Sequence, residues 1–297
     1  MTILDSAVPH RLGRRTSFIP ALEGKAAPWA DVIDVSVDVD RTAEVARAAT
    51  ATVLLTGEDR RSTVSTADVD TLAGLDPDRL LAVRRPVSHQ GMRNYISRAV
   101  VPSELGPKAV WCESFNELSH LRDLLLTSRP TQVTTQPCRL EWVLSSGVRS
   151  HIPDFMLRYS DGHTLLVDVT TSSKVEDPRL LAILRITRAT AEAMGWTYEV
   201  RTELPAQRVR NINFMHAGRR DVRQDRVAAT RFLRSVSGPV DVQRASEVLG
   251  GPPQGYARLW DLIAHGFVHL PLNDELDTDT NLSFASVKGG ESWLHST

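Results

Sequence analysis

The chain has 297 residues, of which 41% are hydrophobic and 24% charged, and its formal net charge is −1 at pH 7. This composition suits a globular protein of one or two domains, and it excludes a protein that coats nucleic acid through overall positive charge. No apolar run approaches the ~18 residues of a membrane span, and two cysteines are too few for a disulfide framework, so both of those classes are excluded as well.

The N-terminal region, residues 1–100, carries the least information. It opens with MTILDSAVPHRLGRR, in which apolar residues precede the arginines, the reverse of a secretory signal, so we expect a cytoplasmic protein. Further on, DVIDVSVDVDRT alternates like a strand, and DRTAEVARAATATVLL has the pattern of a helix or a strand. The structure of this region stays open at this point.

The pattern sharpens from Trp111. The stretch CESFNELSHLRDLLLTS has a phenylalanine and four leucines at helical spacing, and Pro130 ends the run, which predicts a helix. Residues four apart are neighbours on a helix surface, so Glu113 and Glu117 are expected on one face of it.

A β-rich segment follows this helix. The runs QVTTQP, CRLEWVLSSG and RSHIPDFMLRYSDG are separated by Ser-Gly and Asp-Gly turn signals, and TLLVDVTTS reads as a buried strand. A helix from Pro178 to Met194 and the strand WTYEVRT complete the segment. This order predicts an α/β core over 101–220 and a hairpin turned at 160–162 that sets Asp154 beside Asp168.

The last third differs in character. The runs DRVAATRFLRSV, VDVQRASEVLG and PQGYARLWDLIAHG read as three short helices, and FVHLPL reads as a strand. We therefore expect a small helical or winged-helix-like domain with an acidic tail over 221–297.

Glu117, Asp154 and Asp168 form a candidate metal-binding trio. Hydrolysis of a phosphodiester needs a nucleophile at neutral pH and a counter-charge, which Mg²⁺ or Mn²⁺ held by carboxylates supplies. Neighbouring strands lie about 4.8 Å apart, close enough for Asp154 and Asp168 to share one ion. Asp168 is the strongest candidate, because an acid in an apolar strand is costly unless it is paired or bound to a metal. The alternative interpretation makes the three acids turn, cap or solvent-facing residues.

A series of short motifs follows in a fixed order: ESFNEL (113–118), QP (136–137), HIPDFMLRYSDG (151–162), LLVDV (165–169), GWTYEV (195–200) and VRNINFMHAGRR (209–220). Together they resemble the TnsA-like endonuclease subunits of heteromeric transposases, a branch of the restriction-endonuclease-like PD-(D/E)xK superfamily. The stretch LIAHGFVHLPLNDELDTDTNL also looks like the small helical domain that closes such subunits.

The resemblance implies a restriction-endonuclease-like fold, with a mixed central sheet flanked by helices. It implies Mg²⁺-dependent DNA cleavage at the 5′ ends of a mobile element, beside a transposase subunit that cuts the 3′ ends and an ATPase that regulates both. The family's helix glutamate falls on Glu117, its PD aspartate on Asp154 and its second acid on Asp168. The backbone carbonyl of Val169 would complete the metal site.

The sequence departs from the family at Thr170, where the pattern has a lysine that orients water and offsets negative charge. Three substitutes stay open. Lys174 could serve if the chain folds back at 171–173. Arg185 or Arg188 on the next helix could stabilise charge but not act as a base. The metal alone could generate hydroxide, with Thr170 as a hydrogen-bonding neighbour.

Two further features point to DNA. Gln136 and His151 stand near the expected site, although each also suits a structural role. The segment from Arg201 to Arg234 contains nine arginines and only three acidic residues, which indicates either a phosphate-binding surface or a solvated helix face. The DNA-binding candidates in this segment are Arg208, Arg210, Arg219, Arg220 and Arg223.

The sequence therefore supports three hypotheses. The first is a metal-dependent endonuclease subunit of a transposon-like system. The second is a nuclease-fold interaction module that has lost its chemistry and docks DNA or an ATPase. The third, the least supported, is a DNA-binding regulator that acts through its C-terminal helices, because it leaves the pair of aspartates unexplained.

Overall fold

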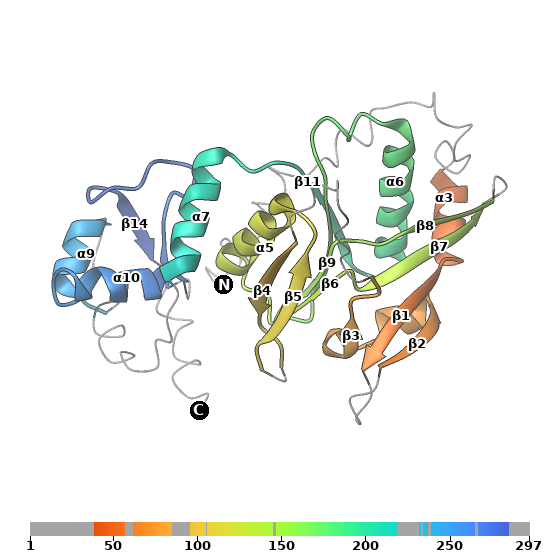
Figure 1. Ribbon diagram of the computed structural model, residues 1–297, viewed down its shortest axis with the longest axis horizontal. Helices are drawn as coiled ribbons and strands as arrows, with labels where there is room; N and C mark the ends of the chain where they lie inside the picture. Colours follow the sequence, from red (N-terminus) through yellow and green to blue (C-terminus); the bar gives the residue numbers. More distant parts are fainter. Residues whose placement is uncertain are drawn as a thin grey trace. The chain divides into compact units, whose positions relative to one another are not determined.

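The computed structural model describes residues 39–56, 62–84, 96–104, 106–144, 147–218, 232, 234–236, 239–264 and 267–284 (Figure 1). Their contacts divide into two compact units. The described residues of the larger unit are 39–120 and 129–203, and those of the smaller unit are 121–128 and the residues from 204 onward. Among the described helices, none combines the length and apolar character needed to cross a membrane.

The larger unit contains an antiparallel sheet in the order β2-β1-β7-β8, and the short strand β3 pairs with residues 54–55 of β1. Its described strands are β1 (Thr50–Thr56), β2 (Ser62–Asp68), β3 (Leu80–Leu81), β7 (Cys138–Leu144) and β8 (Gly147–His151). In contrast to the predicted boundary at residue 100, β1 pairs directly with β7, with Thr50 opposite Glu141. Pairing between segments so far apart in the chain leaves no local sequence signal, so the pattern at 39–81 could not reveal it.

A second sheet of the same unit carries the predicted site. Its order is β11-β10-β9-β6, with β10 and β11 parallel and the other pairs antiparallel. These strands are β6 (Gln132–Thr135), β9 (Phe155–Arg158), β10 (Thr164–Val169) and β11 (Thr197–Arg201). The mixed α/β architecture predicted from the sequence is confirmed. Between the two predicted helices the described residues form five strands, because the run RSHIPDFMLRYSDG is divided between β8 and β9.

The remaining described elements of the larger unit are α3 (Val39–Arg47), α4 (Val69–Ala73), the 3-10 helix η3 (Pro77–Arg79), the hairpin β4 (Ser97–Val101) and β5 (Lys108–Cys112), the start of α5 (Phe115–Thr127), and α6 (Pro178–Ala193). Helix α6 begins where Asp177 Oδ1 accepts a hydrogen bond from Arg179 N at 2.9 Å, and it packs against α3 (Figure 1).

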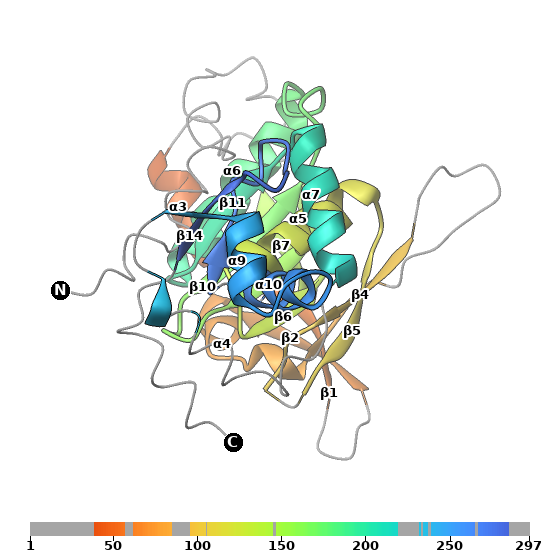
Figure 2. The ribbon, with the colours of Figure 1, turned by 90° about the vertical axis from the view of Figure 1, so that its left-hand side faces the viewer.

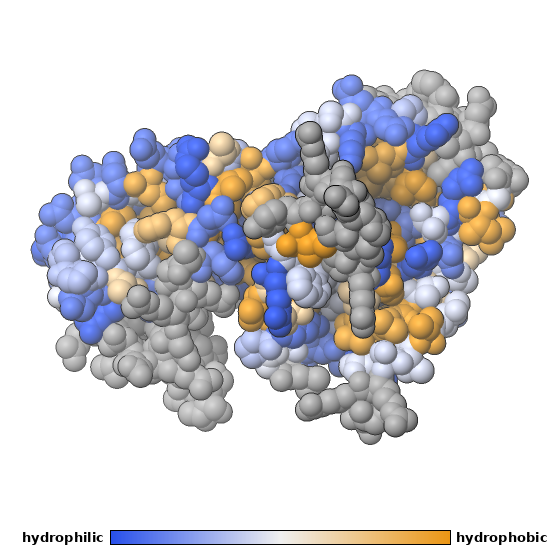
Figure 3. Space-filling view, in the orientation of Figure 1, coloured by the Kyte–Doolittle hydropathy of each residue, from blue (hydrophilic) through white to orange (hydrophobic). Residues whose placement is uncertain are grey.

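The core of the larger unit lies between α6 and the two sheets. The indole of Trp142 is fully buried, and its Nε1 donates to Thr190 Oγ1 of α6 at 3.0 Å. Cys112 and Cys138 are both buried, and burial raises the pKa of the Cys138 thiol to about 12. Figure 3 shows apolar side chains at the surface over β1–β3 and at the far end of the β7–β8 hairpin, where Val143 and Val148 are exposed.

Beyond α5, the described part of the smaller unit contains three helices, two of which pack against the third (Figures 1 and 2). Its described elements beyond α5 are α7 (Ala206–Gly218), β12 (Val240–Asp241), α9 (Val242–Val248), α10 (Gln254–Ala264), β13 (Val268–His269) and β14 (Asn281–Phe284), with the strands ordered β12-β14-β13. This unit begins at residue 204 rather than at the predicted 221, because Asn211 Nδ2 on α7 donates to the carbonyls of Leu272 and Asp274 at 2.9 and 2.7 Å. The winged-helix-like classification stays a prediction.

Candidate active site

The predicted hairpin places Asp154 and Asp168 on adjacent strands. Strands β9 and β10 are antiparallel, with Phe155 opposite Val167, so the two aspartates are the next positions along. Asp154 N donates to the carbonyl of Val167 at 3.0 Å. Gly162 closes the turn with φ +82°, a conformation that glycine adopts without a steric cost. The sequence prediction of this hairpin is confirmed.

Asp168 is buried and held by two side chains. Its Oδ2 accepts hydrogen bonds from the hydroxyl of Tyr198 and from His151 Nε2, the latter at 2.8 Å. Burial lowers the pKa of His151, but the charge and hydrogen bond of Asp168 outweigh it and leave that pKa raised. Burial and the charge of Asp168 both raise the pKa of Tyr198 well above its ordinary range, so the phenol is a permanent donor. These contacts fix the orientation of the Asp168 carboxylate.

Asp154 faces the other acids of the site. Its Oδ2 accepts a hydrogen bond from Val169 N at 2.7 Å. Burial raises the pKa of Asp154 well above its ordinary range, and the charges of Asp168 and Glu117 raise it further. Asp154 therefore interacts electrostatically with both other members of the predicted trio. A cluster of like charges in a buried place is stabilised by a proton or by a cation.

Glu117 occupies the first turn of α5, where it also serves as a cap. Glu117 N donates to Ser114 Oγ at 3.1 Å, and in return Glu117 Oε1 accepts from Ser114 Oγ at 2.8 Å. The other oxygen, Oε2, accepts from Glu113 N at 2.7 Å. Burial raises the pKa of Glu117, with Glu113 adding to the shift and Arg84 opposing it. Both carboxylate oxygens are thus engaged within the helix start, as in a capping box.

The cap gives a stability prediction. We expect Ser114→Ala to lower the free energy of unfolding by about 1 kcal/mol, because it removes the side-chain partner of Glu117 N. Urea denaturation would measure the loss, with Ser65→Ala on the exposed face of β2 as the control that stays within about 0.5 kcal/mol of the parent. Equal stability of both variants would contradict the capping role.

Thr170 continues the pairing of β10 with β11. Its N donates to the carbonyl of Arg201 at 2.9 Å, and its own carbonyl accepts from Asn116 Nδ2 at 2.9 Å. The chain then reverses, since Lys174 N donates to the carbonyl of Thr171 at 3.0 Å. This is the turn that a contribution from Lys174 requires, although the Lys174 side chain is exposed.

The two helix arginines proposed as substitutes for the lysine lie one turn apart on α6. Arg188 is half-buried, and its charge acts on the Tyr198 hydroxyl that binds Asp168. Arg185 is half-buried as well. Arg188 therefore has an electrostatic link to the site.

Gln136 lies beside Asp154 and has an unusual environment. Its N donates to the carbonyl of Asp154 at 2.9 Å, and its carbonyl accepts from Val83 N at 3.0 Å. Its φ of +49° is uncommon for a residue other than glycine and costs on the order of 1 kcal/mol. The side chain is 2% exposed, and neither of its amide atoms has a hydrogen-bond partner in the described part of the chain. A strained conformation of this kind is kept only where the surrounding structure holds it in place, and such conformations are concentrated at functional sites.

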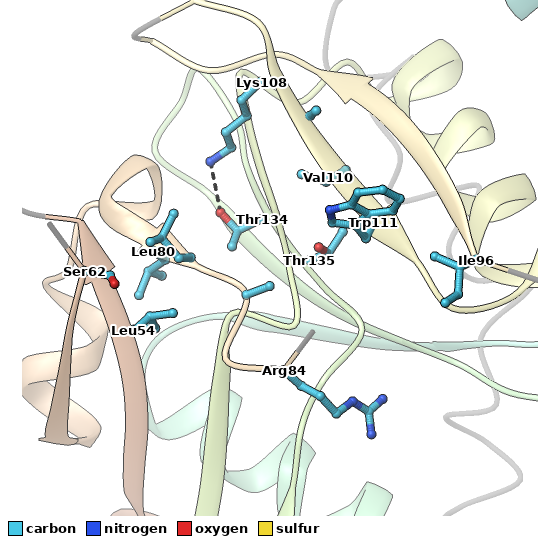
Figure 4. A pocket seen from close by; sticks show the side chains of 13 residues that line it. Leu54, Ser62, Leu80, Arg84, Ile96, Lys108, Val110, Trp111, Thr134 and Thr135 are labelled. Atoms are coloured by element: carbon cyan, nitrogen blue, oxygen red, sulfur yellow. Dashed lines mark hydrogen bonds between the residues drawn. The ribbon is translucent and has the colours of Figure 1, made fainter. Parts of the chain in front are cut away.

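A residue that sequence reasoning missed, Arg84, stands at the edge of the carboxylates. Its Nη2 forms an ion pair with Glu113 Oε2, and its side chain is 49% exposed. Arg84 also lines a hollow of about 630 Å³ next to the β4–β5 hairpin (Figure 4). A tryptophan such as Trp111 is most simply interpreted from sequence as a core residue, but Trp111 is 46% exposed on the wall of this hollow.

The arginine-rich segment is only partly described. Arg208 is buried, with its Nε and Nη2 donating to Asp123 Oδ1 at 2.9 and 2.6 Å. This corrects its assignment as a DNA contact, because its charge is already matched inside the smaller unit. Arg210 is exposed, and its Nε donates to Gln207 at 3.2 Å. The other three candidates, Arg219, Arg220 and Arg223, lie outside the described residues.

The oxygen atoms around Asp154 and Asp168 are possible ligands of a divalent cation. In the part of the chain that the structure describes, no three His, Cys, Asp or Glu side chains are arranged to hold a metal ion together. Asp154 and Asp168 each commit Oδ2 to protein donors, and no described hydrogen bond involves either Oδ1. Two carboxylate oxygens and the carbonyl of Val169 are the hard oxygen donors that Mg²⁺ and Mn²⁺ prefer. The chemistry of these donors fits such an ion.

Residues 130–203 match the family described as TnsA-like endonuclease N terminal. The match spans roughly a quarter of the chain and includes Asp154 and Asp168, whereas Glu117 precedes it. No curated protein matches the chain. The resemblance inferred from the sequence is thereby confirmed, and it indicates a transposon-associated nuclease domain.

Proposed function

We propose that this chain is a metal-dependent DNA endonuclease subunit of a transposon-like system, which hydrolyses phosphodiester bonds at the 5′ ends of the element. Its partners would be DNA, a transposase subunit and a regulatory ATPase. The observation that carries the proposal is the pair of half-buried Asp154 and buried Asp168, held side by side by the β9–β10 hairpin within the segment that matches the nuclease family.

Each residue of the site has a part in this chemistry. Asp154 and Asp168 would hold Mg²⁺ or Mn²⁺, with the Val169 carbonyl as a further ligand and Glu117 as the acid whose charge acts on Asp154. Bound there, the ion would activate water and offset the charge that develops on the phosphate. In the reaction, the water oxygen forms a bond to phosphorus while a P–O ester bond breaks, and a proton passes from the water to solvent as the leaving oxygen gains one. His151 and Tyr198 keep Asp168 in place throughout.

Calorimetric titration with Mn²⁺, repeated with a DNA duplex present, tests the site. We expect Mn²⁺ binding by the parent protein and a loss of at least tenfold in affinity for Asp168→Ala, because the variant lacks one of the two central carboxylates. The matched control is Glu176→Gln, which removes an exposed acid that the sequence places eight residues further on. Binding that is absent from the parent both with and without DNA would contradict the proposal.

A second candidate function is favoured by Thr170 and by the engagement of Glu117 in the helix cap. In this case the nuclease fold has lost its chemistry and docks DNA or the ATPase partner. Asp154→Asn and Asp168→Asn would then leave DNA and partner affinity unchanged, and no cleavage would accompany Mn²⁺ in the complete assembly. A change of at least tenfold in cleavage between parent and variant would decide for the enzyme.

A further inference from the structure

The proposed site lacks the lysine that the motif would place at position 170. A positively charged side chain from a distant part of the chain, Arg84, is connected to the carboxylates of the site instead. Gln136 N donates to the carbonyl of Asp154 at 2.9 Å, and Val83 N donates to the carbonyl of Gln136 at 3.0 Å. Arg84 follows Val83 directly. Its backbone is therefore held two hydrogen bonds away from Asp154.

The Arg84 side chain is anchored to the opposite border of the site. Its Nη2 pairs with Glu113 Oε2, and Glu113 N donates to Glu117 Oε2 at 2.7 Å. Arg84 thus links the strand end that carries Asp154 with the helix start that carries Glu117. The backbone hydrogen bonds and the ion pair thus place Arg84 beside the acidic cluster from two sides.

The charge of Arg84 acts on both sides of the cluster. It opposes the rise in the pKa of Glu117, and it works against protonation of His151, which binds Asp168. The guanidinium is also accessible, since the side chain is 49% exposed and lines the hollow that Trp111 borders (Figure 4). The ion pair with Glu113 engages Nη2, whereas a guanidinium carries five N–H donors in all.

We propose that Arg84 contacts the phosphate of the DNA strand at the carboxylates and supplies the positive charge that Thr170 does not. This inference rests on the proposed function and names a further catalytic residue for it. A guanidinium binds phosphate through two parallel hydrogen bonds, and it stabilises developing negative charge without acting as a base. A ligand in the neighbouring hollow would bring its phosphate to the exposed donors of Arg84.

Restoring the motif lysine at position 170 tests directly whether Arg84 takes over the role of that lysine. Cleavage of supercoiled plasmid would be measured with Mn²⁺ for the parent, Arg84→Ala, Thr170→Lys and the double variant, in the complete chain. We expect Arg84→Ala to reduce cleavage by about 10²–10³, the usual effect of removing one charge-stabilising donor. Adding Thr170→Lys to Arg84→Ala should recover at least tenfold. An Arg84→Ala variant that cleaves like the parent would overturn the inference.

A structural ion pair would give a different result. If Arg84 served only to neutralise Glu113, then Glu113→Gln, which breaks the same ion pair, would reduce cleavage as much as Arg84→Ala does. We expect Glu113→Gln to retain cleavage within about fivefold, because the guanidinium stays available to phosphate. Equal losses in the two variants would overturn the proposed contact.

DNA binding supplies a readout that does not depend on cleavage. Fluorescence anisotropy of a labelled duplex, titrated without divalent metal at several salt concentrations, gives the slope of log K against log [salt]. Arg84→Ala should reduce this slope by about 1, as expected for one lost phosphate contact. Arg79→Ala, an exposed arginine on η3, is the matched control and should leave the slope unchanged.

The two readouts separate the inference from the function on which it rests. Absence of cleavage and of Mn²⁺ binding in the parent would reject the proposed enzyme, and the salt slope would still decide whether Arg84 contacts phosphate. An unchanged slope together with unchanged cleavage in Arg84→Ala would reject the contact while leaving the enzyme in place.

Discussion

Asp154→Asn is expected to abolish cleavage while leaving the fold intact. The variant keeps an oxygen that can accept the hydrogen bond from Val169 N, so β9 and β10 should pair as before. It loses the charge that would hold the metal ion. A bound metal contributes several kcal/mol to transition-state stabilisation, so the rate should fall by roughly three orders of magnitude.

The same variant should be more stable than the parent at neutral pH when metal is absent. Asp154 has a pKa raised above its ordinary value of 3.8, so the folded protein holds this proton more tightly than the unfolded chain does. The folded state therefore loses stability as pH rises from 3.8 towards the raised pKa. Asparagine does not titrate and therefore escapes this loss of stability.

Thermal unfolding measured at several pH values would check the predicted direction of this change in stability. The Tm of the parent should fall relative to that of Asp154→Asn as pH rises from about 4 to 7. His151 contributes in the same direction in both proteins, because its raised pKa gives stability that is present at low pH and lost as pH rises through that pKa. A variant that is less stable than the parent at pH 7 and still cleaves DNA would refute both halves of the prediction.

The second large effect concerns the smaller unit. Arg208→Ala should lower the free energy of unfolding by about 3–5 kcal/mol, the usual consequence of leaving one charge of a buried ion pair without its partner. The stranded group would be Asp123, which is 3% exposed and accepts two hydrogen bonds from Arg208 at 2.9 and 2.6 Å. Urea denaturation of the full chain would measure the change.

A matched arginine on the same helix provides the control for this experiment. Arg210 is exposed, and its Nε donates to Gln207 of the preceding turn, so Arg210→Ala should change stability by no more than about 0.5 kcal/mol. The double variant Arg208→Met with Asp123→Leu should recover much of the loss, because two apolar side chains can replace a buried ion pair. An Arg208→Ala protein as stable as the Arg210→Ala control would show that Asp123 does not depend on the guanidinium.

Local signals explain which parts of the site could be read from the sequence. The Ser-Asp-Gly turn and the apolar run before Asp168 specify the β9–β10 hairpin and its register, so the pairing of Asp154 with Asp168 was predictable. Ser114 and Glu117 stand three residues apart, the spacing of a capping box. Predictions succeeded where a few neighbouring residues determine the geometry.

Contacts between distant segments explain the rest. The partner of Arg84 lies 29 residues further along the chain, and the partner of Arg208 lies 85 residues before it. From the sequence alone, Arg208 looked like its solvent-facing neighbours, because nothing local identifies the buried carboxylate that matches its charge. Trp111 looked like a core residue for the same reason, since the surface of the β4–β5 hairpin is defined by the strands around it.

The backbone at position 170 is held by hydrogen bonds of its own N–H and carbonyl groups, and every amino acid except proline has both. The N–H of Thr170 is bound by Arg201 and its carbonyl by Asn116, so the course of the strand does not depend on which side chain stands there. Lysine, threonine or a smaller residue should therefore be interchangeable at this point without damage to the architecture. Under the proposed function, single substitutions at this one tolerant position would weaken or restore cleavage, so the rate of cutting would be adjustable over short mutational distances.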